Sequence, residues 1–394
     1  MILSTQPLYS KNNDLLISVG TDFTSKNILG SYKNLKFNDR SNINFNLKYS
    51  KKQLLSYLSL NIVNDDQIKF DNSFAKYQMG IANFTIGKID RIWSFSSKSS
   101  LILSSNARPL EAISVHLENK FNKYWLPSNA KWSIEMIHGS TKQSYNRKSS
   151  FYTGARVLFS PTARLGFELF QSSQWSNDKN KYNASTVGAL FFGNSNNGNN
   201  ANINKMAGFG ISYSIPFNES NYRIYGQAVG EDEAGNLPSC YGFISGIELS
   251  LPKIKFPTIT TIELIDTRVP YSTNGNCGPN TMYNNSNYNY VNYDLVLGAP
   301  IDSEAISLEF FGKSQLNENL DFNYTIKLLT INDKDYLYNR LSTKRSSGSI
   351  SALGISWKKN KISISGNVTR QNITLDKANI SRGAVFSLTS SLVF

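Results

Sequence analysis

The chain has 394 residues and a formal net charge of +13, with 40% apolar and only 18% charged residues. The charged share is low for a soluble protein, in which about 25% is usual, and no stretch approaches the ~20 consecutive apolar residues of a membrane helix. A helical membrane protein is therefore excluded, whereas a membrane β-barrel, which hides its apolar face in every second residue, is not.

The N-terminal residues, "MILSTQPLYSKNND", lack a basic segment followed by the apolar core of an export signal. An exported protein with this N-terminus would be a mature or trimmed form. The basic residues are not gathered into a tail. The net charge therefore favours an acidic partner on a structured surface over a disordered nucleic-acid-binding arm.

Hydrophobicity alternates with a period of two along almost the whole chain. In "SNINFNLKYS" (41–50), Ile43, Phe45 and Leu47 share one face, while asparagines and a lysine occupy the other. This alternation predicts strands with one apolar and one polar side. It recurs at 53–63, 68–79, 110–118, 130–139, 150–160, 163–172, 204–214, 221–230, 240–250, 258–267, 303–312, 320–331, 348–358 and 361–372. We therefore expect an all-β chain.

The strand lengths distinguish two all-β architectures. Strands of a soluble sandwich average about 5–6 residues, whereas membrane-spanning strands need about 9–11. The segments here run near the longer value. The final segment, "GAVFSLTSSLVF", alternates to a terminal Phe394 and resembles the last strand of bacterial outer-membrane barrels. A transmembrane antiparallel β-barrel is favoured, with a large soluble sandwich as the alternative.

The links between strands should alternate between short turns and long external loops. Short links are expected at 50–53, 160–163, 214–221, 251–257 and 358–361. The long external loops are expected at about 90–109, 172–203, 231–239, 268–302 and 331–348. The alternation holds if 288–297 belongs to a loop, which leaves about eighteen strands in a single domain over 1–394 and puts both termini on the periplasmic side.

Three segments together resemble the Wzi family of outer-membrane capsule-assembly proteins. They are "YGQAVGEDEAGNLPS" (225–239), "IDRIW…SSLILSSNARP" (89–109) and "MAGFGISYSIP" (206–216), supported in order by "GARVLFSP" (154–161) and "YNYVNYDLVLG" (288–298). The resemblance implies an eighteen-stranded barrel whose external loops occlude the mouth and act as a lectin. Such a protein holds capsular polysaccharide at the cell surface.

The sequence departs from the family pattern in two places. Family members usually carry an N-terminal helical plug, and no helical period precedes the first strand here. A Trp-rich, Gly-Pro-containing run reads here as "RIWSFSSKSS", which retains Trp93 and lacks the Gly-Pro pair.

The external segments contain the residue types that recognise sugars. Carboxylates, amides and guanidinium groups bond hydroxyls, and aromatic rings cover the C–H faces of a sugar. The candidates for polysaccharide binding or for a network at the barrel mouth are Asp90, Arg91, Trp93, Asn106, Arg108, Trp175, Arg223, Glu231, Asp232, Glu233 and Arg268. Arg156, Arg164 and Arg223 alternate with apolar residues and should point inward, where they could meet an acidic polymer or set the ion preference of a pore.

Several of these residues have a structural interpretation as well. Glu231, Asp232 and Glu233 could pair with Arg91, Arg108 or an inward-facing arginine to fix a loop, bond sugar hydroxyls, or bind a cation. The tryptophans could be sugar platforms or members of an interfacial aromatic belt. The run "SSLILSSNARP" could be a packed loop capped by its own polar side chains or a ligand contact.

The remaining chemistry-bearing residues are few. Cys240 and Cys277 both fall on the external side, so a disulfide between them is plausible. His116 and His138 have no nucleophile motif, so we expect no enzyme, no cofactor and no metal site. The expected partners are an acidic capsular polysaccharide, outer-membrane lipid and lipopolysaccharide, bound by a monomer in the bacterial outer membrane. A substrate-specific porin for small anionic or sugar solutes is the alternative.

Overall fold

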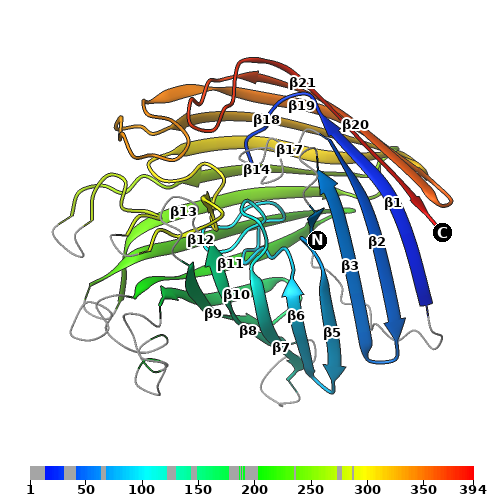
Figure 1. Ribbon diagram of the computed structural model, residues 1–394, viewed down its shortest axis with the longest axis horizontal. Helices are drawn as coiled ribbons and strands as arrows, with labels where there is room; N and C mark the ends of the chain where they lie inside the picture. The colour runs from blue at the N-terminus through cyan, green and yellow to red at the C-terminus, as the bar shows by residue number, and fades with distance from the viewer. Residues whose placement is uncertain are drawn as a thin grey trace.

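The computed structural model describes residues 14–30, 41–63, 68–121, 130–142, 149–176, 186, 188, 190, 203–234, 237–272, 277–285 and 288–394. These residues form a wide antiparallel β-barrel whose lumen is entered by loops from one end (Figure 1). In the part of the chain that is described, no helix is long and apolar enough to cross a membrane.

Most strands have the length that the period-two segments predict. They are β1 Asp14–Thr24, β2 Ser41–Lys51, β3 Leu54–Val63, β4 Ile68–Lys69, β5 Phe74–Met79, β6 Ala82–Lys88, β7 Glu111–Lys120, β8 Lys131–Lys142, β9 Ser149–Ser160, β10 Leu165–Trp175, β11 Asn204–Phe217, β12 Ser220–Ala234, β13 Leu237–Leu251, β14 Thr258–Asp266, β15 Val291–Asn292, β16 Leu295–Val296, β17 Ile306–Asn317, β18 Leu320–Ile331, β19 Ser346–Lys359, β20 Ile362–Asn372 and β21 Gly383–Val393.

The sheet closes because the first strand pairs with the last. β1 and β21 are antiparallel neighbours, with Ser18 opposite Val393 and Thr24 opposite Ser387. The sheet holds nineteen strands, but β4 and β5 both pair with β3, so they share one position and eighteen positions encircle the lumen. The predicted eighteen-stranded antiparallel barrel is confirmed. Closure leaves no unpaired edge, as a spanning sheet requires.

The two faces of the wall follow the alternation in the sequence. On β2, Ile43, Phe45 and Leu47 are 45%, 41% and 38% exposed, and they alternate with Asn44 and Asn46, which bond side chains of β1. Large exposed hydrophobic side chains recur in this way around the barrel. The outer surface is therefore an apolar band of the kind that faces lipid.

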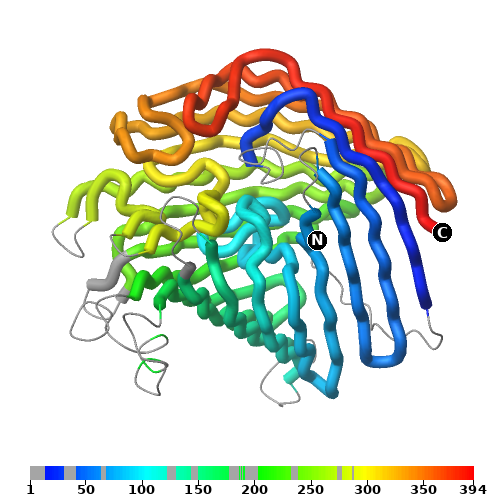
Figure 2. The backbone as a smooth tube through the Cα atoms, in the orientation of Figure 1, coloured from blue at the N-terminus to red at the C-terminus, as the bar shows by residue number. Residues whose placement is uncertain are grey.

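Long loops leave one end of the barrel and fold into it, while tight turns close the other (Figure 2). Residues 288–297 form no spanning strand: β15 and β16 are a two-residue ribbon inside the loop between β14 and β17. The buried apolar core lies mainly in these loops and includes Leu101, Ile102, Tyr283 and Ile301, each fully or almost fully enclosed.

Three local expectations are wrong. The single strand predicted at 68–79 is broken by a turn into β4 and β5. Most of the loop predicted at 231–239 is strand, because β12 and β13 continue their pairing to Ala234 opposite Leu237; residues 235 and 236 lie outside the described part of the structure. Arg164 lies exposed in the turn before β10 and so does not line the lumen. Alternation marks where a strand has a lipid face, but not where a polar hairpin ends.

Candidate functional site

The loop between β6 and β7, residues 89–110, lies inside the barrel and is held by its own polar side chains. Ser96 Oγ accepts hydrogen bonds from the backbone N–H groups of Lys98 and Ser99 at 3.1 and 3.0 Å. Ser100 Oγ donates to the carbonyl of Trp93 at 2.8 Å. Serines of this type replace regular secondary structure as partners of buried backbone groups. The packed-loop interpretation of "SSLILSSNARP" therefore describes this segment.

Charged side chains of the inner wall bond this loop directly. The Arg156 guanidinium pairs with Glu168, with Nε 3.0 Å from Oε2, and also donates to the carbonyls of Ile92 and Ser94. Arg223 repeats the pattern with Glu248, and its other nitrogen donates to the carbonyl of a loop residue, Phe95. In each pair the carboxylate balances the charge of the arginine, and the arginine also donates to loop carbonyls. These bonds offset the free-energy cost of removing the two charges from water.

Trp93 is the deepest aromatic side chain of the loop. It is 1% exposed, its Nε1 donates to Glu135 Oε2 at 2.9 Å, and Glu135 Oε1 also accepts from Arg91 Nε at 2.9 Å. A Cβ on Gly154 would lie 3.0 Å from the Trp93 ring, so the glycine provides its space. Trp93 is therefore neither an exposed sugar platform nor part of an interfacial belt. It anchors the loop.

The same loop is joined to the loop between β14 and β17, residues 267–305. Arg108 makes a bidentate pair with Asp71, both bonds being 2.9 Å, and lies 4.4 Å from the centre of the Tyr293 ring. Asn106 Nδ2 donates to the carbonyl of Val296 at 2.9 Å. Asp90 exchanges two 3.0 Å hydrogen bonds with Asn72. Four of the predicted residues, Asp90, Arg91, Asn106 and Arg108, thus hold the loops in place.

The expected pairing of Glu231 with Arg91 or Arg108 is wrong. Glu231 Oε2 instead accepts from the backbone N–H of Tyr283 at 3.0 Å. The arginines already have partners deeper in the barrel, and β12 carries Glu231 towards the 267–305 loop. Asp232 and Glu233 lie in β12, but their side chains are outside the described part of the structure. Among the described residues there is no group of three or more His, Cys, Asp or Glu that could hold a metal ion, and the cation interpretation of the acidic run depends on side chains outside that part.

A disulfide and two buried phenols complete this joint. Cys240, at the loop end of β13, is bonded to Cys277 in the 267–305 loop. Tyr283 OH donates to the carbonyl of Leu101 at 2.9 Å and accepts from the N–H of Ala299 at 3.0 Å. Burial raises the pKa of the Tyr283 and Tyr290 phenols, so they stay neutral and keep their hydrogen bonds.

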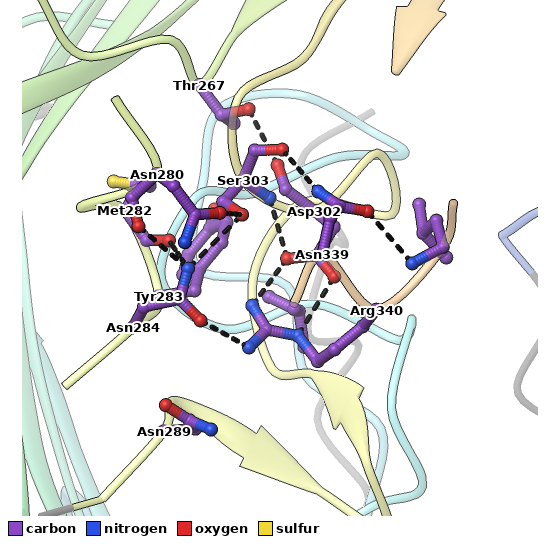
Figure 3. A network of polar contacts seen from close by, with 12 residues as sticks. Thr267, Asn280, Met282, Tyr283, Asn284, Asn289, Asp302, Ser303, Asn339 and Arg340 are labelled. Atoms are coloured by element: carbon purple, nitrogen blue, oxygen red, sulfur yellow. Dashed lines mark hydrogen bonds and ion pairs between the residues drawn. The ribbon is translucent and has the colours of Figure 1, made fainter. Parts of the chain in front are cut away.

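The outer layer of the loops is a polar network centred on Asp302 (Figure 3). Arg340, from the loop between β18 and β19 (residues 332–345), donates from Nε to Asp302 Oδ2 at 2.9 Å and from another nitrogen to Asn284 Oδ1 at 2.6 Å. Ser303 Oγ donates to Asn280 Oδ1 at 2.7 Å. A small cavity of about 10 Å³ lies here. It is lined by Asn106, Asp294, Leu295, Val296, Pro300, Asp302, Arg340 and Leu341.

The 332–345 loop also presents an exposed aromatic pair. Tyr336 and Tyr338 are 41% and 74% exposed, and their ring centres are 5.7 Å apart. Asn332 is fully buried and bonds the backbone of Tyr336 in both directions, at 2.7 and 3.0 Å, and the carbonyl of Ser342 at 3.0 Å. The loop shape that turns the rings outward is therefore built in. The loop was expected on the external side, but its residues carry little signal in the sequence beyond the pattern "YLY" after acidic residues.

Two predicted residues lie elsewhere. Arg268 is paired with Asp266 at 2.7 Å and remains 37% exposed, so it is available at the surface of the loop layer. Trp175 is 1% exposed and packs against Phe151, with Leu190 and Ile203 in the same cluster. Because side chains alternate along β10, Trp175 lies on the outer face of the wall, where these residues cover it. It therefore does not face the mouth of the barrel.

A family model described as capsule assembly protein Wzi matches residues 11–379. The solved structure of Wzi from Escherichia coli, described as an outer membrane protein involved in group 1 capsule assembly and a carbohydrate-binding β-barrel, superposes with a TM-score of 0.79. The identity is 18%, over 96% of this chain and 84% of that one. OprD of Pseudomonas aeruginosa shares the barrel architecture with a TM-score of 0.58 and 9% identity, over 98% of this chain and 96% of that chain.

A curated relative in the cps region of Klebsiella pneumoniae, an uncharacterised 55.8 kDa protein, is 27% identical over 168 residues. The match covers 42% of this chain, and it spans only a third (33%) of the length of that relative.

Proposed function

The chain belongs to the Wzi family of capsule assembly proteins, and from that premise we propose that it binds capsular polysaccharide on its external loop layer and retains it at the cell surface. The proposal includes a monomeric, non-enzymatic protein with its loops outside and its termini in the periplasm. The single observation that carries it is the exposed Tyr336–Tyr338 pair on a loop of fixed shape, next to the Arg340–Asp302 network.

This arrangement suits a sugar polymer for two reasons. Tyrosine rings held at the surface offer flat faces to the C–H groups of a sugar, with hydroxyls free to bond. Their rigidity limits the entropy lost on binding, because Asn332 already orders the loop. The +13 net charge favours an acidic polymer, although the exposed Arg268 and Arg345 are already paired with Asp266 and Asp333.

The porin alternative requires an open lumen, and the described loops occupy it from several sides. The 89–110 loop bonds β8, β9, β12 and, through Lys98 and Glu309, β17. On the other side, Gln371 of β20 donates to the carbonyl of Asn27, and Ala378 donates to that of Leu341. These contacts favour a fixed loop layer over a solute pathway.

The proposal is tested by binding of purified capsular polysaccharide to the full chain in detergent. The Tyr336→Ala/Tyr338→Ala variant should bind about tenfold more weakly, because each ring contributes roughly 0.5–1.5 kcal/mol of stacking and 1.4 kcal/mol is tenfold. Phe217→Ala/Tyr222→Ala is the matched control, since it removes an exposed aromatic pair at the short-turn end.

Unchanged migration of unheated samples in gels would show that both variants fold. Equal affinity of the Tyr336→Ala/Tyr338→Ala variant and the wild type would refute the site. Binding that fails for the wild type, accompanied by steady channel openings in a planar bilayer, would favour the porin.

A further inference from the structure

The outer wall of the barrel has an apolar hollow where β6, β7 and β8 approach the loop end. Two overlapping shallow depressions, of about 420 and 500 Å³, share Ile86, Ile113 and His138. Ile86 and Ile113 are 62% and 56% exposed, and Met136 beside them is 43% exposed. These residues stand on the face that lipid covers, so hydrocarbon chains are the medium that fills the hollow.

Close backbone approaches and a strand break lie in the wall beside the hollow. A Cβ on Gly87, which has a φ of +130°, would lie 2.3 Å from the carbonyl oxygen of Ser73, and one on Gly139 would lie 2.5 Å from that of Glu111. Neighbouring backbones therefore approach closely here, and β4 stops after two residues. By the alternation of β6 and β8 both glycines face the lumen, so these close approaches lie in the wall beneath the hollow.

Aromatic side chains bound the hollow on the β9 side. Phe151 lies 5.5 Å from the His138 ring and 4.9 Å from Trp175. Thr153 Oγ1 lies 2.9 Å from His138 Nδ1 and accepts from Trp175 Nε1 at 3.1 Å. This side of the hollow is therefore a rigid surface, which favours one bound arrangement of a lipid over the changing contacts of bulk lipid.

Charged groups stand at the upper rim of the same three strands. Lys88 ends β6, Glu111 begins β7 and Lys142 ends β8, all on the outward face. Glu111 Oε1 lies 3.0 Å from the ammonium groups of both lysines. Two ammonium groups against one carboxylate leave a positive charge, and the Lys88, Glu111 and Lys142 side chains remain 19%, 43% and 48% exposed.

We propose that this rim and hollow form a binding site for lipid A, with phosphate on Lys88 and Lys142 and acyl chains over Ile86, Ile113 and Met136. Three adjacent strands span about 10 Å, which is wide enough for more than one chain. The external end of a barrel faces the outer leaflet, where lipid A is the phosphorylated lipid. The proposal rests on the proposed orientation of the loops, but not on polysaccharide binding.

The test is native mass spectrometry of the full chain in detergent, titrated with purified lipid A and separately with phosphatidylglycerol. The wild type should bind lipid A at least tenfold more tightly. Lys88→Gln/Lys142→Gln should lose at least tenfold in lipid A affinity. Lys253→Gln is the matched control, because Lys253 is an exposed lysine at the short-turn end that pairs with Glu219 at 2.9 Å, and it should bind like the wild type.

A second variant keeps the test decisive if the lysine variant fails to fold. Ile113→Trp fills the hollow with an apolar side chain, so it should weaken lipid A binding at least fivefold while polysaccharide binding stays unchanged. Equal affinity for phosphatidylglycerol, or unchanged lipid A binding in either variant, would overturn the site. If either variant loses polysaccharide binding but keeps its lipid A affinity, the lipid site is overturned and the proposed function is tested separately.

Discussion

From β8 round to β18 the inward side chains carry charge, whereas from β20 round to β3 they carry mainly hydroxyl and amide groups. The first half contains the Arg156–Glu168, Arg223–Glu248 and Lys327–Glu309 pairs. The second contains hydroxyl and amide pairs such as Ser363–Ser391 and Asn46–Ser18.

The 89–110 loop bonds the charged half. Its irregular backbone has carbonyls that need donors, and an arginine held by a carboxylate can serve both the ion pair and the carbonyl. The hydroxyl and amide pairs satisfy one another across neighbouring strands and need no loop. Buried charge is thus concentrated where it fixes the loop layer.

The largest effect should follow from breaking an anchor on the charged half. Glu168→Ala leaves Arg156 buried without its carboxylate, and loss of one partner of a buried ion pair costs about 3–5 kcal/mol. We expect a lower midpoint of unfolding in urea and channel openings in planar bilayers as the 89–110 loop loosens. A variant that shows no channel openings and has the same urea midpoint as the wild type would contradict the anchoring role.

Removing the covalent joint should have a somewhat smaller effect. Cys240→Ser/Cys277→Ser opens a crosslink between residues 37 positions apart, and native disulfides typically contribute about 2–4 kcal/mol. The 267–305 loop should become sensitive to protease while the barrel still migrates as a folded band. Protease resistance equal to that of the wild type would show that Tyr283 and Glu231 hold the loop without the disulfide.

The uncharged half provides the contrasting substitution. Ser363→Ala removes one partner of a 2.7 Å hydroxyl pair with Ser391, which should cost only about 0.5–1.5 kcal/mol. The midpoint of urea unfolding should shift little, and the variant should show no channel openings in a planar bilayer. A loss as large as that of Glu168→Ala would remove the distinction between the two halves.

The smallest effect is expected from mild acid. The Asp376 carboxylate accepts from the N–H and Oγ1 of Thr343 at 2.9 and 2.7 Å and so joins two loops. Burial alone would raise its pKa, but these hydrogen bonds outweigh burial and lower the pKa to about 2. A depressed pKa contributes stability that is present above the ordinary value near 3.8 and lost as pH falls through about 2. Polysaccharide affinity should therefore be equal at pH 7 and pH 5, and a drop over that interval would contradict this role.

The barrel could be predicted from the sequence because its signal is local. Ile43, Phe45 and Leu47 reveal their lipid face within one segment, and the alternation of short and long links gives the strand number. The polar ends of strands carry no such signal, so the sequence does not predict how far the β12–β13 pairing extends.

The candidate site was less predictable because its contacts are distant in sequence. Nothing near Glu231 indicates that its partner is the N–H of Tyr283, and nothing near Trp93 indicates Glu135. A tryptophan in an external segment suggests a platform, but an inward loop buries it. Tyr336 and Tyr338 become candidates only when the Asn332 bonds show which way they point.

The most direct test of the account is the partition of capsular polysaccharide between cells and medium. A strain lacking this chain would be complemented with the wild type or with Tyr336→Ala/Tyr338→Ala, at equal surface levels. We predict normal total polysaccharide in both, with most of it retained by the wild type and most released by the variant. Equal retention by the two strains would contradict the claim that this loop surface holds the polymer.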